Sequence, residues 1–578
     1  MIRTPHALCL PIALAGLWSP AASAPQEVAA AATPRAAAIR SLDQYIADAF
    51  VYLGIDDVHA FGAGLAGLKI SGLFSEPFVE TLLESLAAKG QLMMVTDWES
   101  FESSELAAHI PDPGGLVQIL KGIRGGIGFA VLDADNLEDQ PGIAIGVDLG
   151  QGGERAVAWL SQALGQLAAN EDIEFRVEKG PAGTTFTLGK LGSAEAPVEE
   201  RAYIAIADDY LIATNERSAL AGLLGSPLPR RLGGSARFLE ASAELRRPGG
   251  LFGYLDLQPI VGMILGDGGA GAEAERALDA LGLMDMSYLG LSICPEDEAM
   301  RYRGRLRVEG GLPVLKGAFG SKRRFDTLAI APANSLAAVS LSVRPQQMFD
   351  GMLAMVAAVD PGAHQEALES MEFMREAAGI DIEGDLIAEI GTELSIIAVP
   401  SSSPLPIPDV FVVLEMKDEG SVDRLAALLA ALGGEELGSE RIGRGRLFEL
   451  PEGTDDLEIE GFAAIGRHLA VALPIPMTQP RLALERLLAA EGGQGSLTRH
   501  AGFRRTTEHC ALSQGGATFL YSLDWPGLAE VIYKPAKAFA PFAIEDEDVL
   551  ELLPDAEVLK RHLIPAAGLL RFDEKGIW

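Results

Sequence analysis

Two glycine-rich segments have residue spacings that could bind a nucleotide cofactor. Residues 61–68 read FGAGLAGL, which has the glycine spacing of flavin- and nicotinamide-binding loops. Such a loop functions because a buried strand leads directly into it and the next helix N-terminus meets the pyrophosphate. Asp56, Asp57 and His59 stand where that strand would have to be, so we interpret these glycines as small residues that let a helix pack closely. Residues 266–271 follow an expected helix and are interpreted as a loop.

The acidic segment 133–139 has the composition of a calcium loop but not its spacing. Leu137 stands where the third ligand belongs, and Glu138 stands where the turn requires glycine. Ala144 occupies the position of the bidentate glutamate that would close the site. We therefore interpret this segment as a solvated hairpin loop.

Motifs of nucleophilic and phosphate chemistry are absent from the sequence. It contains no HExxH, CxxC, GxSxG or SxxK, and the pair Gly189-Lys190 is followed by Leu191 where a phosphate-binding loop has Ser or Thr. The metal-ligand types that come closest in sequence, at spacings unsuited to zinc, are His500, Glu508, His509 and Cys510. The sequence therefore predicts no metal and no cofactor, assigns no catalytic residue, and favours a protein without enzymatic activity.

One charged pattern is unusual for this acidic chain. From Met300 to Val308, arginine alternates with mostly apolar residues, which predicts a strand with one basic face. The four residues of that face are Arg301, Arg303, Arg305 and Arg307. They are our candidates for binding an anionic ligand or an acidic partner. The alternative, which we favour, is that they pair with neighbouring acidic residues, among them Glu296, Asp297 and Glu298 across a hairpin.

Length and composition indicate a large globular protein. The chain has 578 residues, more than one hydrophobic core normally serves, so we expect several domains. Apolar residues make up 48%, charged residues 22% and aromatic residues 6%, which excludes a disordered or disulfide-dense chain. Asp and Glu number 81 against 46 Lys and Arg, which gives a formal charge of -35. This charge makes nucleic acids and anionic lipid surfaces unsuitable partners.

The first residues have the form of a secretory signal peptide. Residues 1–6 carry one arginine, residues 7–18 are mainly apolar, and Ala22-Ser23-Ala24 has the small-x-small pattern of a cleavage site. We expect residues 1–24 to be the signal peptide and residues 25–40 an Ala/Pro-rich linker. No later segment has the run of about 18 apolar residues that crosses a bilayer. We therefore expect a periplasmic or secreted protein.

Two cysteines, Cys294 and Cys510, follow the expected linker. A disulfide framework therefore does not hold the fold together. We favour two free thiols that act as small hydrophobic residues, and a single bridge between them is the alternative.

The sequence repeats itself once along its length. Apolar strand patterns of the first half return in the same order in the second, beginning with VYLGI at Val51 and VSLSV at Val339. An amphipathic helix pattern and a strand hairpin also return, and a later match pairs Tyr254 with Tyr521. A conserved order with insertions between the matches indicates a tandem duplication.

The repeat predicts both the fold class and the domain boundaries. Short alternating strands that are half-buried predict mainly antiparallel sheets, with helices packed on one face of each, in the α+β class. We expect unit 1 at residues 41–308, an inter-unit linker at 309–329 and unit 2 at 330–578.

The end of the chain is expected to leave the second sheet incomplete. In unit 1, the strand near Leu289 returns as the long arginine strand. The matching strand Ala567 to Phe572 is followed only by a turn and Ile577-Trp578. We expect either a longer reading frame, which we favour, or a partner that completes the sheet.

The order of these features resembles a family of exported proteins. The export signal, the Val-x-Leu-x-Val strand, the amphipathic helix, the hairpin at residues 203–213 and the duplication are similar to large exported proteins of unknown function in Gram-negative bacteria. The resemblance implies an envelope location and carries no catalytic residues. We expect a non-enzymatic scaffold or binding module for a lipophilic ligand or a protein partner. The alternative is a hydrolase with its site in the cleft between the two units.

Overall fold

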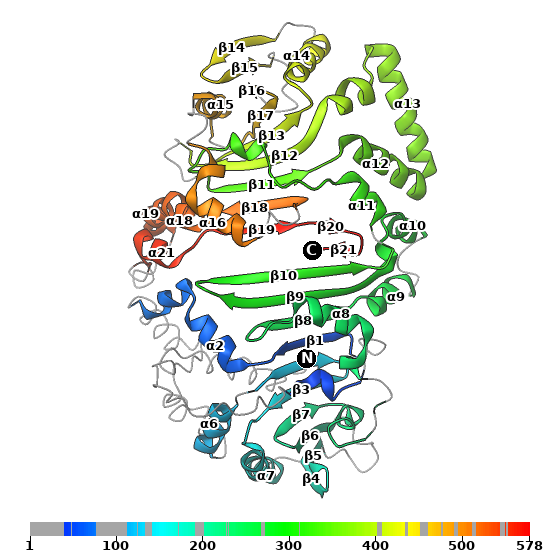
Figure 1. Ribbon diagram of the computed structural model, residues 1–578, viewed down its shortest axis with the longest axis vertical. Helices are drawn as coiled ribbons and strands as arrows, with labels where there is room; N and C mark the ends of the chain where they lie inside the picture. Colours follow the sequence, from blue (N-terminus) through cyan, green and yellow to red (C-terminus); the bar gives the residue numbers. More distant parts are fainter. Residues whose placement is uncertain are drawn as a thin grey trace. The chain divides into compact units, whose positions relative to one another are not determined.

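The computed structural model describes residues 40–578 apart from some segments, and it divides into two compact units. The segments outside the description are 48, 77–111, 124, 133–140, 171–172, 191–200, 227, 229–230, 267–271, 311, 402–406, 434–436, 451–459, 476–477, 490–494, 511–515, 544–549 and 551–552. Unit 1 comprises Met1–Ile264 with Ser287–Arg307, and unit 2 comprises Leu265–Met286 with Val308–Trp578. Each unit contains an antiparallel sheet and helices, which confirms the α+β class (Figure 1).

Unit 1 is built on strands in the order β10-β9-β8-β1-β2-β3-β7-β6-β5-β4. They are β1 (Val51–Ile55), β2 (Ile127–Val131), β3 (Ile143–Asp148), β4 (Ile173–Gly180), β5 (Gly183–Lys190), β6 (Arg201–Ala207), β7 (Tyr210–Thr214), β8 (Leu251–Asp256), β9 (Met286–Glu296) and β10 (Ala299–Val308). The helical segments are η3 (Leu42–Gln44), α2 (Val58–Ala66), η4 (Lys69–Ser75), α6 (Pro113–Gly122), α7 (Gly153–Asn170), η5 (Arg217–Leu220), η6 (Leu232–Gly234), α8 (Ala236–Leu245) and α9 (Gln258–Gly266).

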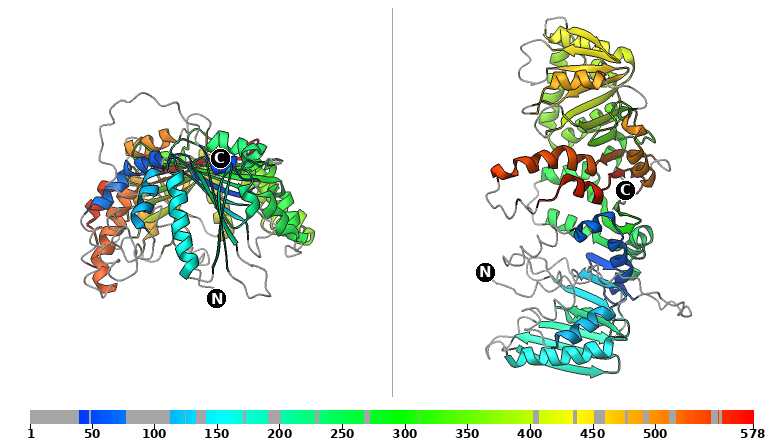
Figure 2. Two further views of the ribbon diagram at one scale, coloured as in Figure 1. Left: turned by 90° about the horizontal axis from the view of Figure 1, so that it is seen from below. Right: turned by 90° about the vertical axis from the view of Figure 1, so that its left-hand side faces the viewer.

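Alternation along these strands sends side chains to two faces of the unit 1 sheet. Tyr52, Phe252 and Tyr254 lie on one face, where their rings surround Phe238 of α8 at centroid distances of 5.3 to 5.7 Å. On the other face, residues such as Val147 pack against α6 and α7. Figure 2 shows α7, in cyan, lying against the strands of its unit.

Unit 2 contains a nine-stranded sheet in the order β14-β15-β16-β17-β13-β12-β11-β18-β19. Its strands are β11 (Ala337–Ser342), β12 (Ile390–Val399), β13 (Asp409–Met416), β14 (Gly438–Ile442), β15 (Gly445–Glu449), β16 (Gly461–Ile465), β17 (His468–Ala472), β18 (Phe519–Leu523) and β19 (Ala566–Leu570). The helical segments are α10 (Ala272–Ala280), η7 (Leu283–Asp285), α11 (Pro313–Ala318), η8 (Thr327–Ala329), α12 (Pro345–Val359), α13 (Pro361–Ala378), η9 (Ile382–Leu386), η10 (Ile387–Glu389), α14 (Glu419–Gly433), α15 (Pro480–Ala489), η12 (Leu497–Arg499), α16 (Ala501–His509), α18 (Trp525–Leu528), η13 (Ala529–Tyr533), α19 (Lys534–Ala543) and α21 (Ala556–His562).

Helices pack on both faces of each sheet, each over only some of the strands, in contrast to the single helical face that we expected. In unit 2, Phe411 and Val413 of β13 lie in the core that α15 closes with Leu484. The alternate residues Leu414 and Met416 pack against α14. The reason is that β13 carries apolar side chains at both sets of alternating positions, so each face needs a cover.

The two sheets share one strand order. The series β9-β8-β1-β2-β3-β7-β6-β5-β4 of unit 1 corresponds, strand for strand, to β19-β18-β11-β12-β13-β17-β16-β15-β14 of unit 2. The strand that begins at Val51 (β1) and the strand that contains Val339 (β11) therefore occupy equivalent positions in their two sheets. Each is central, paired antiparallel with the next strand of the chain and with a strand that enters much later.

The backbone hydrogen bonds of the matched strands make different residues equivalent from those that the repeated sequence patterns align. Phe50 N donates to Val131 O, and Leu336 N donates to Ala398 O in the same way. These bonds make Ala337, two residues before Val339, the counterpart of Val51. Tyr254 and Tyr521 are also not equivalent, because Tyr254 is buried and Tyr521 is exposed on the other face. A slip of one residue reverses the face of a side chain, and strands that are apolar on both sides give little sequence signal against it.

Two segments that the sequence placed elsewhere pack into unit 2. Residues 309–329, which the sequence marks as a linker, contain α11 and bury Phe325 and Leu328 in the unit 2 core. Residues 265–286, which we expected in unit 1, group with unit 2 because α10 lies against α12. The Nη1 of Arg276 donates to Ala358 O at 3.2 Å.

The last residues form a short hairpin after β19. β20 (Phe572–Asp573) pairs antiparallel with β21 (Gly576–Ile577). The Nε1 of Trp578 donates to Asp573 Oδ2 at 2.9 Å. In the part of the chain that the structure describes, no helix combines the length and hydropathy needed to cross a membrane.

Candidate functional site

The four arginines that the sequence singled out lie on β10 and pair with glutamates of unit 1. Arg301 and Arg303 contact Glu296, which precedes the hairpin turn, at 2.6 and 3.7 Å. Arg305 and Arg307 contact Glu244 and Glu240 of α8, each at 3.8 Å. These contacts are of the kind that we favoured over ligand binding. A role of the arginine face in holding an anionic ligand stays a prediction.

Helix α8 is fixed on the sheet by this charged face and by apolar packing. Phe238, Ala241 and Leu245 are buried at intervals of three and four residues, which is the spacing of one helix face. Leu245 can approach β9 closely because Gly290 has no side chain. A Cβ on Gly290 would lie only 2.4 Å from Leu245 Cδ1. The arginine strand and Gly290 together set the position of the α8 N-terminus.

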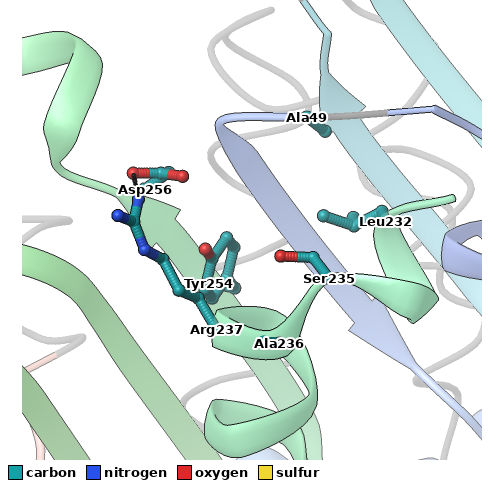
Figure 3. Close-up of a pocket in the computed structure, with 7 residues that line it drawn as sticks. All are labelled: Ala49, Leu232, Ser235, Ala236, Arg237, Tyr254 and Asp256. Atoms are coloured by element: carbon teal, nitrogen blue, oxygen red, sulfur yellow. Dashed lines mark ion pairs between the residues drawn. The ribbon is translucent and has the colours of Figure 1, made fainter. Parts of the chain in front are cut away.

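A pocket of about 390 Å³ lies at that N-terminus (Figure 3). Its lining residues are Ala49, Leu232, Ser235, Ala236, Arg237, Tyr254 and Asp256. Ser235 is the residue before α8, and its side chain makes no capping hydrogen bond. The Nη1 of Arg237 lies 3.5 Å from Asp256 Oδ1, which also accepts a hydrogen bond from Gln258 N at 3.1 Å.

This pocket combines a polar rim with an apolar floor. Leu232 and Tyr254 are buried beneath it, while Arg237 and Asp256 balance each other's charge. It can hold a small polar molecule, and we see no nucleophile paired with a base among its lining residues. No sequence motif pointed to this pocket. Ser235 ahead of an amphipathic pattern signals a helix start, but nothing local in the sequence brings Asp256 to that point.

The face of the unit 1 sheet opposite α8 is lined with aliphatic side chains. One row runs from Phe129 of β2 through Leu53 of β1 and Gly253 of β8 to Leu291 of β9. The next row consists of Val131, Val51, Leu255 and Leu289. Leu53, Leu289 and Leu291 keep 40%, 43% and 39% of their surface exposed. This surface, the open apolar face, has no polar side chain in either row.

Unit 2 has a similar open face at the equivalent strands. Ile396 of β12 pairs with Val339 of β11, which pairs with Tyr521 of β18, and Tyr521 pairs with Gly568 of β19. Ile396 and Tyr521 are among the exposed large hydrophobic residues. The Tyr521 ring lies over Gly568, where a Cβ would come within 2.3 Å of the ring. The same kind of surface thus occurs in both units.

A buried polar network crosses the opposite face of the unit 2 sheet. The Nζ of Lys322 lies 3.0 Å from Glu393 Oε2 and 2.8 Å from Glu415 Oε2. Glu393 also accepts hydrogen bonds from the backbone N–H groups of Asp326 and Thr327 at 3.0 and 2.7 Å. Arg467 adds an ion pair with Glu415 at 2.8 Å. The network holds the segment before η8 against β12 and β13.

The charges of this network shift the titration of its members. Burial opposes ionisation of Glu415, but hydrogen bonding to Lys322 and its positive charge outweigh burial and lower the pKa of Glu415. Burial likewise opposes the charge of Lys322, and hydrogen bonds to Glu415 and Glu393 overcome it and raise the Lys322 pKa. All its carboxylates have partners, so we interpret the network as structural.

The other residues considered for chemistry are scattered. Residues 61–66 belong to α2, and Gly64 lies against Pro295, which confirms the close-packing interpretation for that glycine. The acidic segment 133–139 falls outside the described residues. His500 is exposed at the start of α16, and no cluster of three metal-ligand types occurs among the described residues. Cys294 is buried, Cys510 is half-buried, and neither forms a disulfide, as we favoured.

Comparison with known proteins gives no relative. No protein-family model, no curated protein and no solved structure matches the chain.

Proposed function

We propose that the protein is an exported binding module that holds an apolar ligand, such as an acyl chain, against the open apolar face of its sheets. The observation that carries this proposal is the exposure of Leu53 of β1 and of Leu289 and Leu291 of β9, which lie on one face of the sheet on either side of β8. Exposed apolar residues that occur singly are ordinary, but contiguous rows without a polar side chain characterise surfaces that bind.

The energetics favour an apolar ligand over a charged one. Covering aliphatic surface stabilises a complex by about 25 cal/mol per Å² of apolar area removed from water. The rows contain no donor, acceptor or charge that could orient a polar ligand. The net charge of -35 also disfavours an anionic ligand, so a neutral lipid is the best match.

Duplication and export belong to the same proposal. A duplicated unit is supported by the shared strand order, the equivalent hydrogen bonds at Phe50 and Leu336, and the open face in both units. Export is supported by the form of residues 1–24. Cell fractionation followed by N-terminal sequencing tests it, and an uncleaved protein in the cytosol would contradict it.

Binding of a pyrene-labelled monoacylglycerol, a neutral probe, tests the function. The double variant Leu53→Asn/Leu291→Asn should bind it about tenfold more weakly or worse, because two apolar contacts of roughly 1 kcal/mol each are lost. Leu239→Asn is the matched control, since Leu239 is an exposed leucine on α8. Absence of binding by the unmodified protein, or equal loss in the control, would contradict the proposal. Turnover of an ester, peptide or glycoside would favour the hydrolase alternative instead.

A further inference from the structure

Strand β4 ends the unit 1 sheet, and β5 is its neighbour on one side only among the strands that the structure describes (Figure 1). The pairing with β5 extends over the whole of β4, from Ile173 to Gly180. Two charged side chains of β4, Glu174 and Arg176, keep 46% and 64% of their surface exposed to solvent. A sheet edge of this length is a template on which a further strand can pair.

The turn between β4 and β5 determines which backbone groups of β4 point to the open edge. Gly180 and Gly183 lie opposite each other across a turn of two residues, so the N–H and C=O groups of Gly180 point toward β5. Along an antiparallel strand, alternate residues bond to the neighbour on one side and on the other. The backbone groups of Ile173, Phe175 and Val177 therefore point away from β5, toward the open edge.

The side chains of β4 alternate between apolar and charged. Ile173, Phe175 and Val177 share one face of the strand, where Phe175 and Val177 pack against the core beneath α7. Glu174 and Arg176 share the other face, and their charged groups lie 3.4 Å apart. An antiparallel copy of β4 fits this pattern when Phe175 lies opposite Phe175 of the second copy. Ile173 then lies opposite Val177, and Glu174 lies opposite Arg176, so each charge meets its opposite.

The backbone and the side chains select the same register. With Phe175 on the two-fold axis, the residues whose backbone groups point outward form the hydrogen-bonded pairs. Glu174 and Arg176 form the pairs between them, in which side chains of the two strands come closest. An axis at Arg176 would instead oppose two arginines and set Glu174 against Glu178.

We infer that two copies of the chain associate through β4 in this register, which joins their unit 1 sheets into one continuous sheet. The contact is isologous, because each copy contributes the same strand to it. On the charged face, every carboxylate lies beside one guanidinium of its own chain and opposite one of the second copy. The strands of the open apolar face are not part of this contact.

Sedimentation equilibrium of the full-length protein tests the inference. At about 0.15 M salt, the repulsion between two chains of net charge -35 is largely screened, and the small interface should form a dimer at micromolar concentrations. Arg176→Glu and Glu174→Arg should each weaken the dimer about tenfold or more, because both place like charges opposite each other. The double variant Glu174→Arg/Arg176→Glu restores opposite charges and should dimerise as the unmodified protein does.

Glu178→Arg is the matched control for the change of charge. Glu178 is an exposed glutamate on the same face of β4, outside the charge pairs of this register, so this variant should dimerise normally. A recovered dimer in the double variant would also show that the single variants are folded. An unmodified protein that stays monomeric, a double variant that stays monomeric, or an equal loss in Glu178→Arg would each overturn the inference.

Discussion

Lys322 places its Nζ 3.0 Å from Oε2 of Glu393, a side chain with no surface exposed to solvent. The same ammonium neutralises Glu415. Breaking a buried ion pair by removing one partner leaves an uncompensated charge and costs about 3 to 5 kcal/mol. Lys322→Met should therefore lower the free energy of unfolding by about 3 kcal/mol or more, measured by urea denaturation at pH 7.

Lys417→Met is the control for this prediction. Lys417 is exposed just after β13, so the same substitution should change the free energy of unfolding by no more than about 0.5 kcal/mol. Equal effects of the two substitutions would show that the network contributes nothing beyond an ordinary surface lysine.

His468 should make the fold sensitive to mild acid. Burial, together with the charge of Arg467, lowers the pKa of His468, although a hydrogen bond from its ring to Ile465 O opposes the shift. Below the ordinary histidine pKa of about 6.5, the unfolded chain binds a proton that the folded chain does not, so stability falls as pH falls. His468→Leu should reduce this loss between pH 7 and pH 5 in urea denaturation. His59→Leu, at an exposed site on α2, should leave it unchanged.

The lowered pKa of Glu415 predicts a second loss of stability, at a more acidic pH. Its lowered pKa means that its stabilisation is complete above the ordinary glutamate pKa and is lost as pH falls through the folded value. The protein should therefore lose stability again below about pH 4.5, and Lys322→Met should flatten this part of the profile. An unchanged profile in that variant would contradict the assignment of the shift to Lys322.

Local patterns of the sequence predict part of this structure well. The arginine strand was predicted because alternation over nine residues is a local signal. The repeated order of apolar patterns predicted the same succession of strands in both halves of the chain, but not the order of the strands within each sheet. Register was not predicted, because β1 and β11 are bordered by apolar residues on both faces and tolerate a shifted alignment.

The sites depend on contacts between distant residues, which the sequence does not display. Lys322 meets Glu393 across 71 positions and Glu415 across 93. One signal was available: Glu393 and Glu415 stand at inward positions of apolar strands, and a buried carboxylate requires a buried partner. No such signal marks the pocket at Asp256, which depends on how α8 crosses the sheet.

The arginine face should contribute unequally along its length. Arg305 is 1% exposed beside Glu244, whereas the Arg301 side chain is one-third exposed beside Glu296. Arg305→Met should cost about 3 kcal/mol because Glu244 loses its partner, and Arg301→Met about 1 kcal/mol or less. The double variant Glu244→Leu/Arg305→Met should recover stability relative to Arg305→Met. If the stability lost by the double variant equals the sum of the losses of the two single variants, Glu244 and Arg305 do not interact.

A side chain at Gly290 should destabilise unit 1. A Cβ there would lie 2.4 Å from Cδ1 of Leu245, which is fully buried and cannot turn into solvent. Gly290→Ala should displace α8 and cost about 1 to 3 kcal/mol, the usual range for overpacking a core. Gly262→Ala is the matched control, because a Cβ at Gly262 meets nothing within 4 Å and Ala favours the α9 helix by about 0.5 to 1 kcal/mol. Urea denaturation of both variants should give shifts of opposite sign, and two shifts of the same sign would mean that α8 is not held against β9 as described.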